Sequence, residues 1–150
     1  MAVVSSNLFK GLLLDYYYLR RAESECGQGQ RFVIKKAIFG RSQIVSQNNT
    51  GAGGWTIGVI PADFDLVSNN RGFQAYPDVD VTATPVSSTV INITASLTDK
   101  DYAAHPQFDF NTLVLTDAEN KAIAVLCCQQ DTLYLGKSFT VQMTIEQKVI

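Results

Sequence analysis

The chain has 150 residues, 46% of them hydrophobic, which is enough to bury one core and predicts a single domain over residues 1–150. Twelve Lys and Arg against fourteen Asp and Glu give a net charge of -2, and neither sign forms a long run. This charge pattern argues against a nucleic-acid surface, which needs clustered cationic side chains to displace the counterions of the phosphates.

The N-terminal region predicts the one long helix of the chain, over residues 7–26. Residues 5–7 offer Ser and Asn side chains that can cap its start, and Gly27 and Gly29 stand where a left-handed C-terminal cap is expected. The helix is inferred from apolar residues that recur near a period of 3.6, namely Leu8, Phe9, Leu12, Leu13, Tyr16, Tyr17 and Leu19.

The same region does not resemble a secretory signal, because polar residues such as Ser5, Lys10 and Asp15 interrupt its apolar stretches. No other segment approaches the roughly 20 apolar residues of a membrane-spanning helix. We therefore expect synthesis in the cytoplasm and no insertion into a membrane.

Beyond the helix the hydrophobic period changes to two, which is typical of strands. Residues 31–39 predict a strand ended by Gly40, and residues 55–60 predict a second, shorter strand. Between them, the sequence SQNNTGAGG at residues 46–54 predicts an exposed loop. Residues 66–72 are polar and rich in Asn, and they predict another connection.

The second half of the chain has the clearer strand pattern. Residues 78–83 and 90–97 alternate between apolar and polar side chains, so each strand has one buried and one solvated face. Residues 108–115 and 122–128 are two apolar runs joined by a polar link of hairpin length. The last strand places Phe139, Val141, Met143 and Ile145 on one face.

These elements predict a mainly β (α+β) fold. One N-terminal helix is followed by about six or seven strands over residues 31–150, which form an antiparallel sandwich or a barrel-like sheet. The sequence contains no internal repeat and no heptad pattern.

The side chains that usually carry catalysis are scarce. His105 is the single histidine and precedes Pro106 in a loop-like segment, so a Ser or Cys nucleophile has only one candidate base. Cys127 and Cys128 are adjacent, which places them on opposite faces of a strand, and Cys26 is the only other thiol. An odd count with two neighbours is a poor framework for disulfides. We predict no catalytic, cofactor-binding or metal-binding residues and no cofactor.

Two alternatives remain for the acidic residues. Calcium needs several oxygens on one loop, and residues 99–101 lack the Gly and the bidentate Glu of a helix-loop-helix site. A glycosidase pair stays open, because carboxylates can converge from distant strands, although turns and solvated faces explain most of them. The residues concerned are Asp63, Asp65, Asp78, Asp80, Asp99, Asp101, Asp109 and Asp117.

Glycine and aromatic clusters suggest binding only weakly. Residues 51–54 lack the Lys-Ser or Lys-Thr ending of a phosphate loop, and a strand rather than a helix follows them. Tyr16, Tyr17 and Tyr18 lie about 100° apart around a helix and cannot share one face, so part of the cluster is expected in the core and part at an interface.

Two segments resemble a known family. Residues 32–40, Phe-Val-Ile-Lys-Lys-Ala-Ile-Phe-Gly, follow a helix and a Gly turn, as in the opening of the phage tail-collar fibre family. Residues 108–117 with the continuation at residues 120–125 are similar to that family's strand, acidic turn and return strand. The positions occupied here by Asn111, Thr112 and Val114 depart from the family's usual acidic residue and glycine.

The resemblance implies a structural part of a phage, prophage or contractile tail that forms the base of a fibre. It also implies the particle-proximal domain of a tail fibre, a homo-oligomer that is commonly a trimer, and partners among other tail or baseplate proteins. After synthesis the protein would become part of the particle. We expect the predicted helix and residues 46–54 to contribute contacts.

The alternative function is a carbohydrate-binding β-sandwich, in which Trp55, Tyr76 and Tyr102 would stack on sugar rings of a glycan. An enzyme that acts through paired carboxylates ranks third, because a fold class does not define a function.

Overall fold

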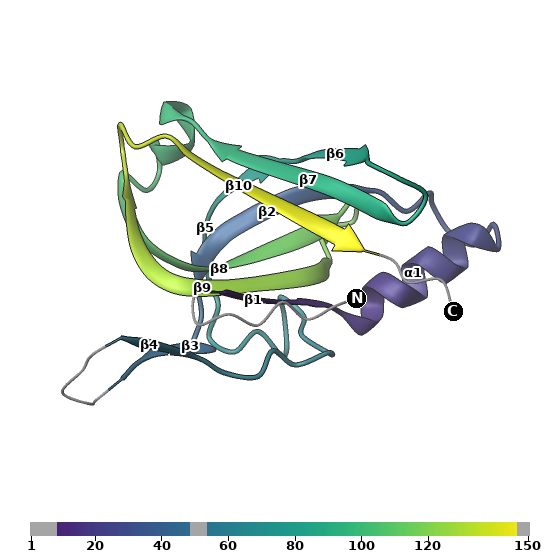
Figure 1. Cartoon of the computed structure of the whole chain (residues 1–150), viewed down its shortest axis with the longest axis horizontal. Coiled ribbons are helices and arrows are strands. Elements are labelled where there is room, and N and C mark those ends of the chain that lie inside the picture. Colours follow the sequence, from purple (N-terminus) through teal and green to yellow (C-terminus); the bar gives the residue numbers. More distant parts are fainter. Residues whose placement is uncertain (1–8, 49–53, 147–150) are drawn as a thin grey trace.

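A computed structural model describes residues 9–48 and 54–146 (Figure 1). Its one α-helix and one 3-10 turn, α1 and η1, accompany ten antiparallel strands in the described residues, so the predicted mainly β class is confirmed. The elements in chain order are β1 (Phe9–Leu13), α1 (Asp15–Glu25), β2 (Ile34–Arg41), β3 (Val45–Gln47), β4 (Trp55–Ile57), β5 (Gln74–Asp80), β6 (Thr82–Pro85), β7 (Val90–Leu97), η1 (Asp99–Tyr102), β8 (Gln107–Asp117), β9 (Ala122–Tyr134) and β10 (Phe139–Glu146).

The sequence prediction of one helix over residues 7–26 is wrong in its first half. Residues Phe9–Leu13 form β1, which pairs antiparallel with β9, and the helix begins only at Asp15 after the N-cap residue Leu14. A short apolar run fits either a helix or a strand, and the free edge of β9 decides in favour of the strand. The expected caps at residues 5–7 lie outside the described residues. The C-terminal prediction is confirmed, since Gly27 and Gly29 have φ of 74° and 71°.

Two sheets lie over each other with the main core between them (Figure 1). The larger sheet has the order β1-β9-β8-β2-β5, and the smaller has the order β10-β7-β6. The chain passes from β5 directly into β6 and so joins the sheets along one side, where the Val81 N–H donates to the Lys35 carbonyl at 3.1 Å. The sheets do not close into a barrel: β10 ends one of them and β1 ends the other.

Strand β8 lies at the centre of the molecule. Its residues from Phe110 to Asp117 are all buried, because one face packs on the main core and the other on a second apolar cluster. The connection from β2 to β5 covers that second face with Ile44, Val45, Ile60 and Phe64. Because neither face of this stretch meets solvent, polar residues of β8 are buried together with the apolar ones, namely Asn111, Thr112, Thr116 and Asp117.

The strands predicted at residues 90–97, 108–115 and 139–145 are found as β7, β8 and β10, whereas β9 continues beyond the predicted residues 122–128 to Tyr134. The β8–β9 hairpin turns through Asn120, whose φ is 63°, and the Asp117 carboxylate accepts the N–H groups of Glu119 and Lys121. In β10 the predicted inner face is the less exposed one, with Ile145 buried.

Other boundaries differ from the prediction. Gly40 does not end β2, which continues to Arg41. The expected exposed loop at residues 46–54 is partly the β3–β4 hairpin, while residues 49–53 lie outside the described part of the chain. The single strand expected at residues 78–83 is the junction of β5 and β6. The first residues of β5 were missed because Pro77 lies inside it, and Pro is tolerated only at sheet edges.

No helix within the described residues is long and apolar enough to cross a membrane.

Candidate assembly surface

The single histidine and the possible metal ligands do not gather into a reactive site in the described residues. His105 lies against Tyr76, with ring centroids 5.2 Å apart in an edge-on arrangement. Over residues 9–48 and 54–146, no group of three or more His, Cys, Asp or Glu side chains could hold a metal ion. The contact of His105 is thus a packing contact between two rings, and it gives no indication of a catalytic role.

Several of the acidic residues accept hydrogen bonds from groups close to them in the sequence. Asp65 accepts the Val67 and Ser68 N–H groups at 2.7 and 2.6 Å, and these bonds, with that of the Ser68 hydroxyl, hold its pKa below the ordinary value. Asp101 completes a capping box with Thr98. Such contacts are typical of residues that shape turns.

The adjacent thiols face opposite sides of β9, as predicted. Cys127 is buried in the second cluster, while Cys128 is half-buried beside the main core. Burial raises the pKa of Cys127 to about 11 and that of Cys128 to about 12. Since only the thiolate is a good nucleophile, both groups are unreactive near neutral pH.

Thiol labelling tests this assignment. At pH 8 a pKa near 11 leaves roughly a thousandth of a thiol ionised, so the folded protein should react quickly with an aromatic disulfide reagent at exposed Cys26 alone. The denatured chain should titrate all three thiols. Rapid reaction of two or three thiols in the folded protein would contradict the burial of Cys127 and Cys128.

The tyrosine cluster divides between core and surface, and its expected core part is Tyr17. Tyr17 is buried and packs edge-on against Phe32 at 5.4 Å, whereas Tyr18 is 44% exposed. The Tyr16 hydroxyl donates to the Asp117 carboxylate at 3.0 Å, and burial followed by this hydrogen bond raises the Tyr16 pKa. Tyr16 thus ties helix α1 to the β8–β9 turn.

The aromatic residues proposed to bind sugars do not form one platform. Tyr102 is 1% exposed, and its hydroxyl donates to the Lys137 carbonyl at 3.0 Å. Tyr76 stacks on Phe108 with centroids 5.0 Å apart. Trp55 borders a separate polar hollow of 450 Å³, together with Gln43, Gln47, Gln74 and Gln130. Tyr102 is thereby excluded as a sugar-stacking surface.

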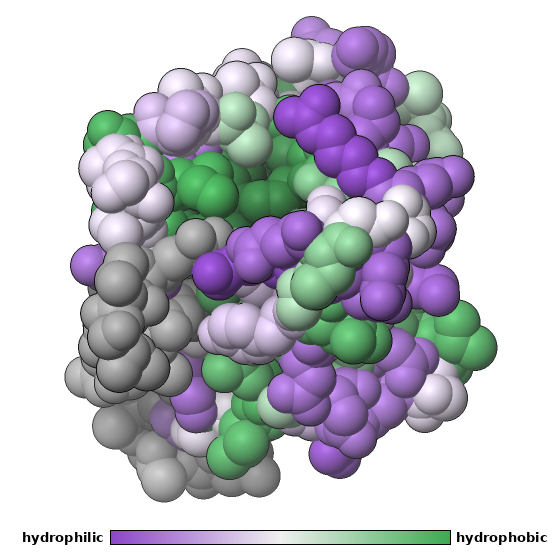
Figure 2. Space-filling model, turned by 90° about the vertical axis from the view of Figure 1, so that its right-hand side faces the viewer, coloured by the Kyte–Doolittle hydropathy of each residue, from purple (hydrophilic) through white to green (hydrophobic). Residues whose placement is uncertain are grey.

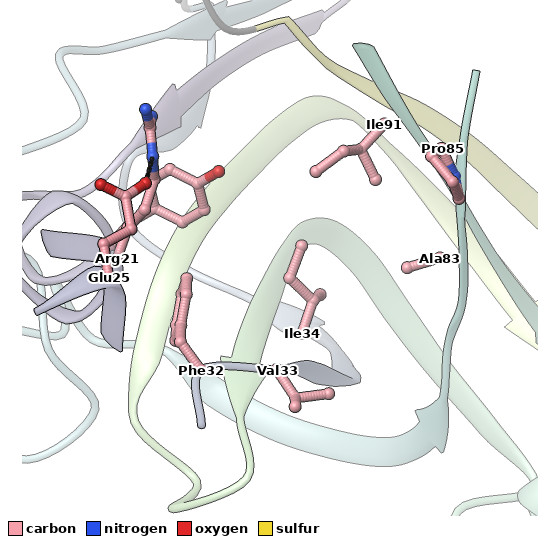
Figure 3. Close-up of a pocket in the computed structure, with 9 residues that line it drawn as sticks. Arg21, Glu25, Phe32, Val33, Ile34, Ala83, Pro85 and Ile91 are labelled. Carbon is pink, nitrogen blue, oxygen red and sulfur yellow. Dashed lines mark hydrogen bonds and ion pairs between the residues drawn. The ribbon is translucent and has the colours of Figure 1, made fainter. Parts of the chain in front are cut away.

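An apolar groove opens at the end of the molecule beside α1. It has a volume of 380 Å³, and in Figure 2 an apolar hollow with polar margins lies on the face turned to the viewer. Figure 3 shows Ile34 of β2 and Ile91 of β7 on opposite walls, with Arg21 and Glu25 of α1 at the rim. Tyr17, Phe32, Val33, Ala83 and Pro85 complete the lining.

Three of the four edge strands of the two large sheets carry features that discourage pairing with another chain. β5 contains Pro77 and two aspartates, β6 has only four residues and ends with Pro85, and β1 has five residues with Lys10 among them. β10 has eight residues without proline, and its only charge is Glu146 at the end. The alternating side chains of residues 139–145 predict the strand but not its edge position, because edge position depends on the sheet order.

The described residues thus form an antiparallel β protein with one long edge strand that lacks proline, β10, and one apolar groove beside α1. The chain belongs to the family described as Bacteriophage P1 tail fiber protein R, whose model matches residues 1–149. Over 145 residues it is 41% identical to "Tail fiber protein R" of Escherichia phage P1, which covers 97% of this chain and 96% of that relative. No solved structure matches.

The prediction of a phage tail fibre protein with a structural role is therefore confirmed. The alternative, a carbohydrate-binding module, finds no support in these relatives. A tail fibre protein is a component of the phage particle.

Proposed function

We propose that this protein is a non-enzymatic part of the base of a tail fibre, where it associates with itself and with other tail or baseplate proteins. The relative's name supports the fibre role, and a two-layer β-sandwich of residues 1–150 would provide the rigid scaffold. No cofactor or catalytic residue is needed for this role.

The observation that carries the proposal is the β10 edge, which no strand of residues 9–48 and 54–146 covers on its outer side. An eight-residue strand without proline and with a single terminal charge presents a row of backbone donors and acceptors to a partner strand. The groove beside α1 adds apolar surface, which fits the expected contribution of the N-terminal helix to contacts.

The resemblance that implies a trimer and the edge that favours strand pairing lead to different subunit numbers. Three copies require a head-to-tail contact between two different surfaces, whereas two copies can use one surface twice. Molar mass in solution distinguishes these two forms of the proposed homo-oligomer.

The fibre role is tested in the particle itself. We expect purified particles to contain this protein and particles made without it to lack fibres, with fibres restored when the gene is supplied separately. Electron microscopy and mass spectrometry of the particles give both readouts. Normal fibres on particles that lack the protein would refute a role at the fibre base.

A further inference from the structure

We propose that β10 joins two copies of this chain by antiparallel pairing with the β10 of the second copy. Two three-stranded sheets would then become one continuous six-stranded sheet. The inference deepens the proposed function, because it assigns self-association to one strand and one register.

The hydrogen bonds of the β6–β7 hairpin show which backbone groups of β10 face outward. The Val86 N–H donates to the Val90 carbonyl at 2.9 Å, so Val90 bonds toward β6. Successive residues of an antiparallel strand bond alternately to its two neighbours, so the odd-numbered residues of β7 bond toward β10. These residues lie opposite the odd-numbered residues of β10. The N–H and C=O groups of Thr140, Gln142 and Thr144 therefore point to the outer edge of the sheet, where none of the described strands pairs with β10.

The sequence of β10 is complementary to itself in one register. Outward-pointing residues must pair with each other, and placing Gln142 opposite the second copy's Gln142 meets this condition over most of the strand. Thr140 then lies opposite Thr144, and Phe139 lies opposite Ile145. Glu146 falls beyond the strand's other end, opposite Ser138, so no like charges oppose each other.

The inner face of β10 supplies apolar area to the same contact. Phe139, Val141 and Met143 are only half-buried at the side where the two sheets are not joined. A second β10 alongside would cover these side chains further, which adds hydrophobic stabilisation to the backbone hydrogen bonds.

A second copy of β10 fits this edge better than a charged strand of another protein would. The edge carries no charge from Ser138 to Ile145, so it offers nothing to select a charged segment. Its outward side chains are exposed Thr and Gln, and Thr–Thr pairs across strands are favourable. A two-fold contact also ends with the dimer, which leaves no further β10 edge open to another chain.

Paired charge variants test the strand and the register together. The wild-type chain should have twice the mass of one chain in light scattering after size exclusion. The double variant Thr140→Lys with Thr144→Lys places Lys opposite Lys and should become monomeric, with at least a tenfold loss of affinity. The variant Thr140→Lys with Thr144→Glu places Lys opposite Glu twice and should remain dimeric.

Two further variants control for folding and for charge alone. Thr84→Lys makes the same change on the exposed part of β6 and should leave the dimer intact. Gln142→Pro removes one outward N–H without breaking the ladder to β7 and should give a monomer with an unchanged circular dichroism spectrum.

Each other outcome overturns the inference. A monomeric or trimeric wild type, a Lys–Lys variant that stays dimeric, a Lys–Glu variant that dissociates or a Thr84→Lys variant that dissociates each excludes this pairing. The fibre role would still stand if particles contain the protein and need it for fibres, so the two failures are distinguishable.

Discussion

The Gly40→Ala variant should lose about 3 kcal/mol or more of its free energy of unfolding. A Cβ atom at this position of β2 would overlap the Gln74 carbonyl oxygen and would lie 2.6 Å from Phe73 Cε1. The first contact is with backbone, so relief requires β5 to move away from β2, and overpacking of this kind is costly. Urea denaturation of the purified variant measures the loss.

Gly11→Ala is the matched control, because it makes the same change in another strand. Its Cβ would lie 3.3 Å from the flexible end of Leu126 and 3.8 Å from the Val125 carbonyl oxygen, which is an ordinary contact, and we expect a change of less than about 1 kcal/mol. Equal stability of the two variants would show that β5 does not approach Gly40 as closely as described.

The Phe39→Ala variant should lose about 3–5 kcal/mol of the free energy of unfolding. Phe39 is fully buried, and its ring lies 5.3 Å from that of Phe110 and 6.1 Å from that of Phe139. These rings come from β2, β8 and β10, so the cluster connects the two sheets through the core. Removing Phe39 leaves a cavity and deletes contacts to both sheets.

Val67→Ala provides the control for this loss. Val67 is 92% exposed, and its truncation should change stability by less than about 0.5 kcal/mol. A small effect of Phe39→Ala in the same urea series would mean that the two sheets do not pack through these rings.

Alternating side chains made the strands of the second half predictable. In β7 and β10 every inner residue is apolar and most outer residues are polar, so the pattern alone indicates both the strand and its buried face. The adjacent thiols of β9 followed from the same period of two. The candidate assembly surface was harder to predict from the sequence. The pattern around Phe139 indicates which face of the strand is buried but not that the strand lies at an edge of its sheet.

The local sequence could not separate β1 from the helix that follows it. The apolar spacing continues from Leu12 through Tyr16, and only the pairing of β1 with β9 delays the start of the helix to Asp15. A strand was predicted at residues 55–60, and β4 occupies its first three residues, whereas β3 was not predicted. Each has three residues, and the two stabilise one another by pairing. Short strands depend on their neighbours more than on their own residues.

The sequence by itself determined the β class, the buried faces of the later strands and the scarcity of reactive side chains, because these depend on residue type and local period. Only the tertiary structure decided which strands are edges, which apolar side chains stay half-buried and where the groove opens. Sheet order brings together residues far apart in the chain, as β10 and β7 show, and no local pattern encodes such an order.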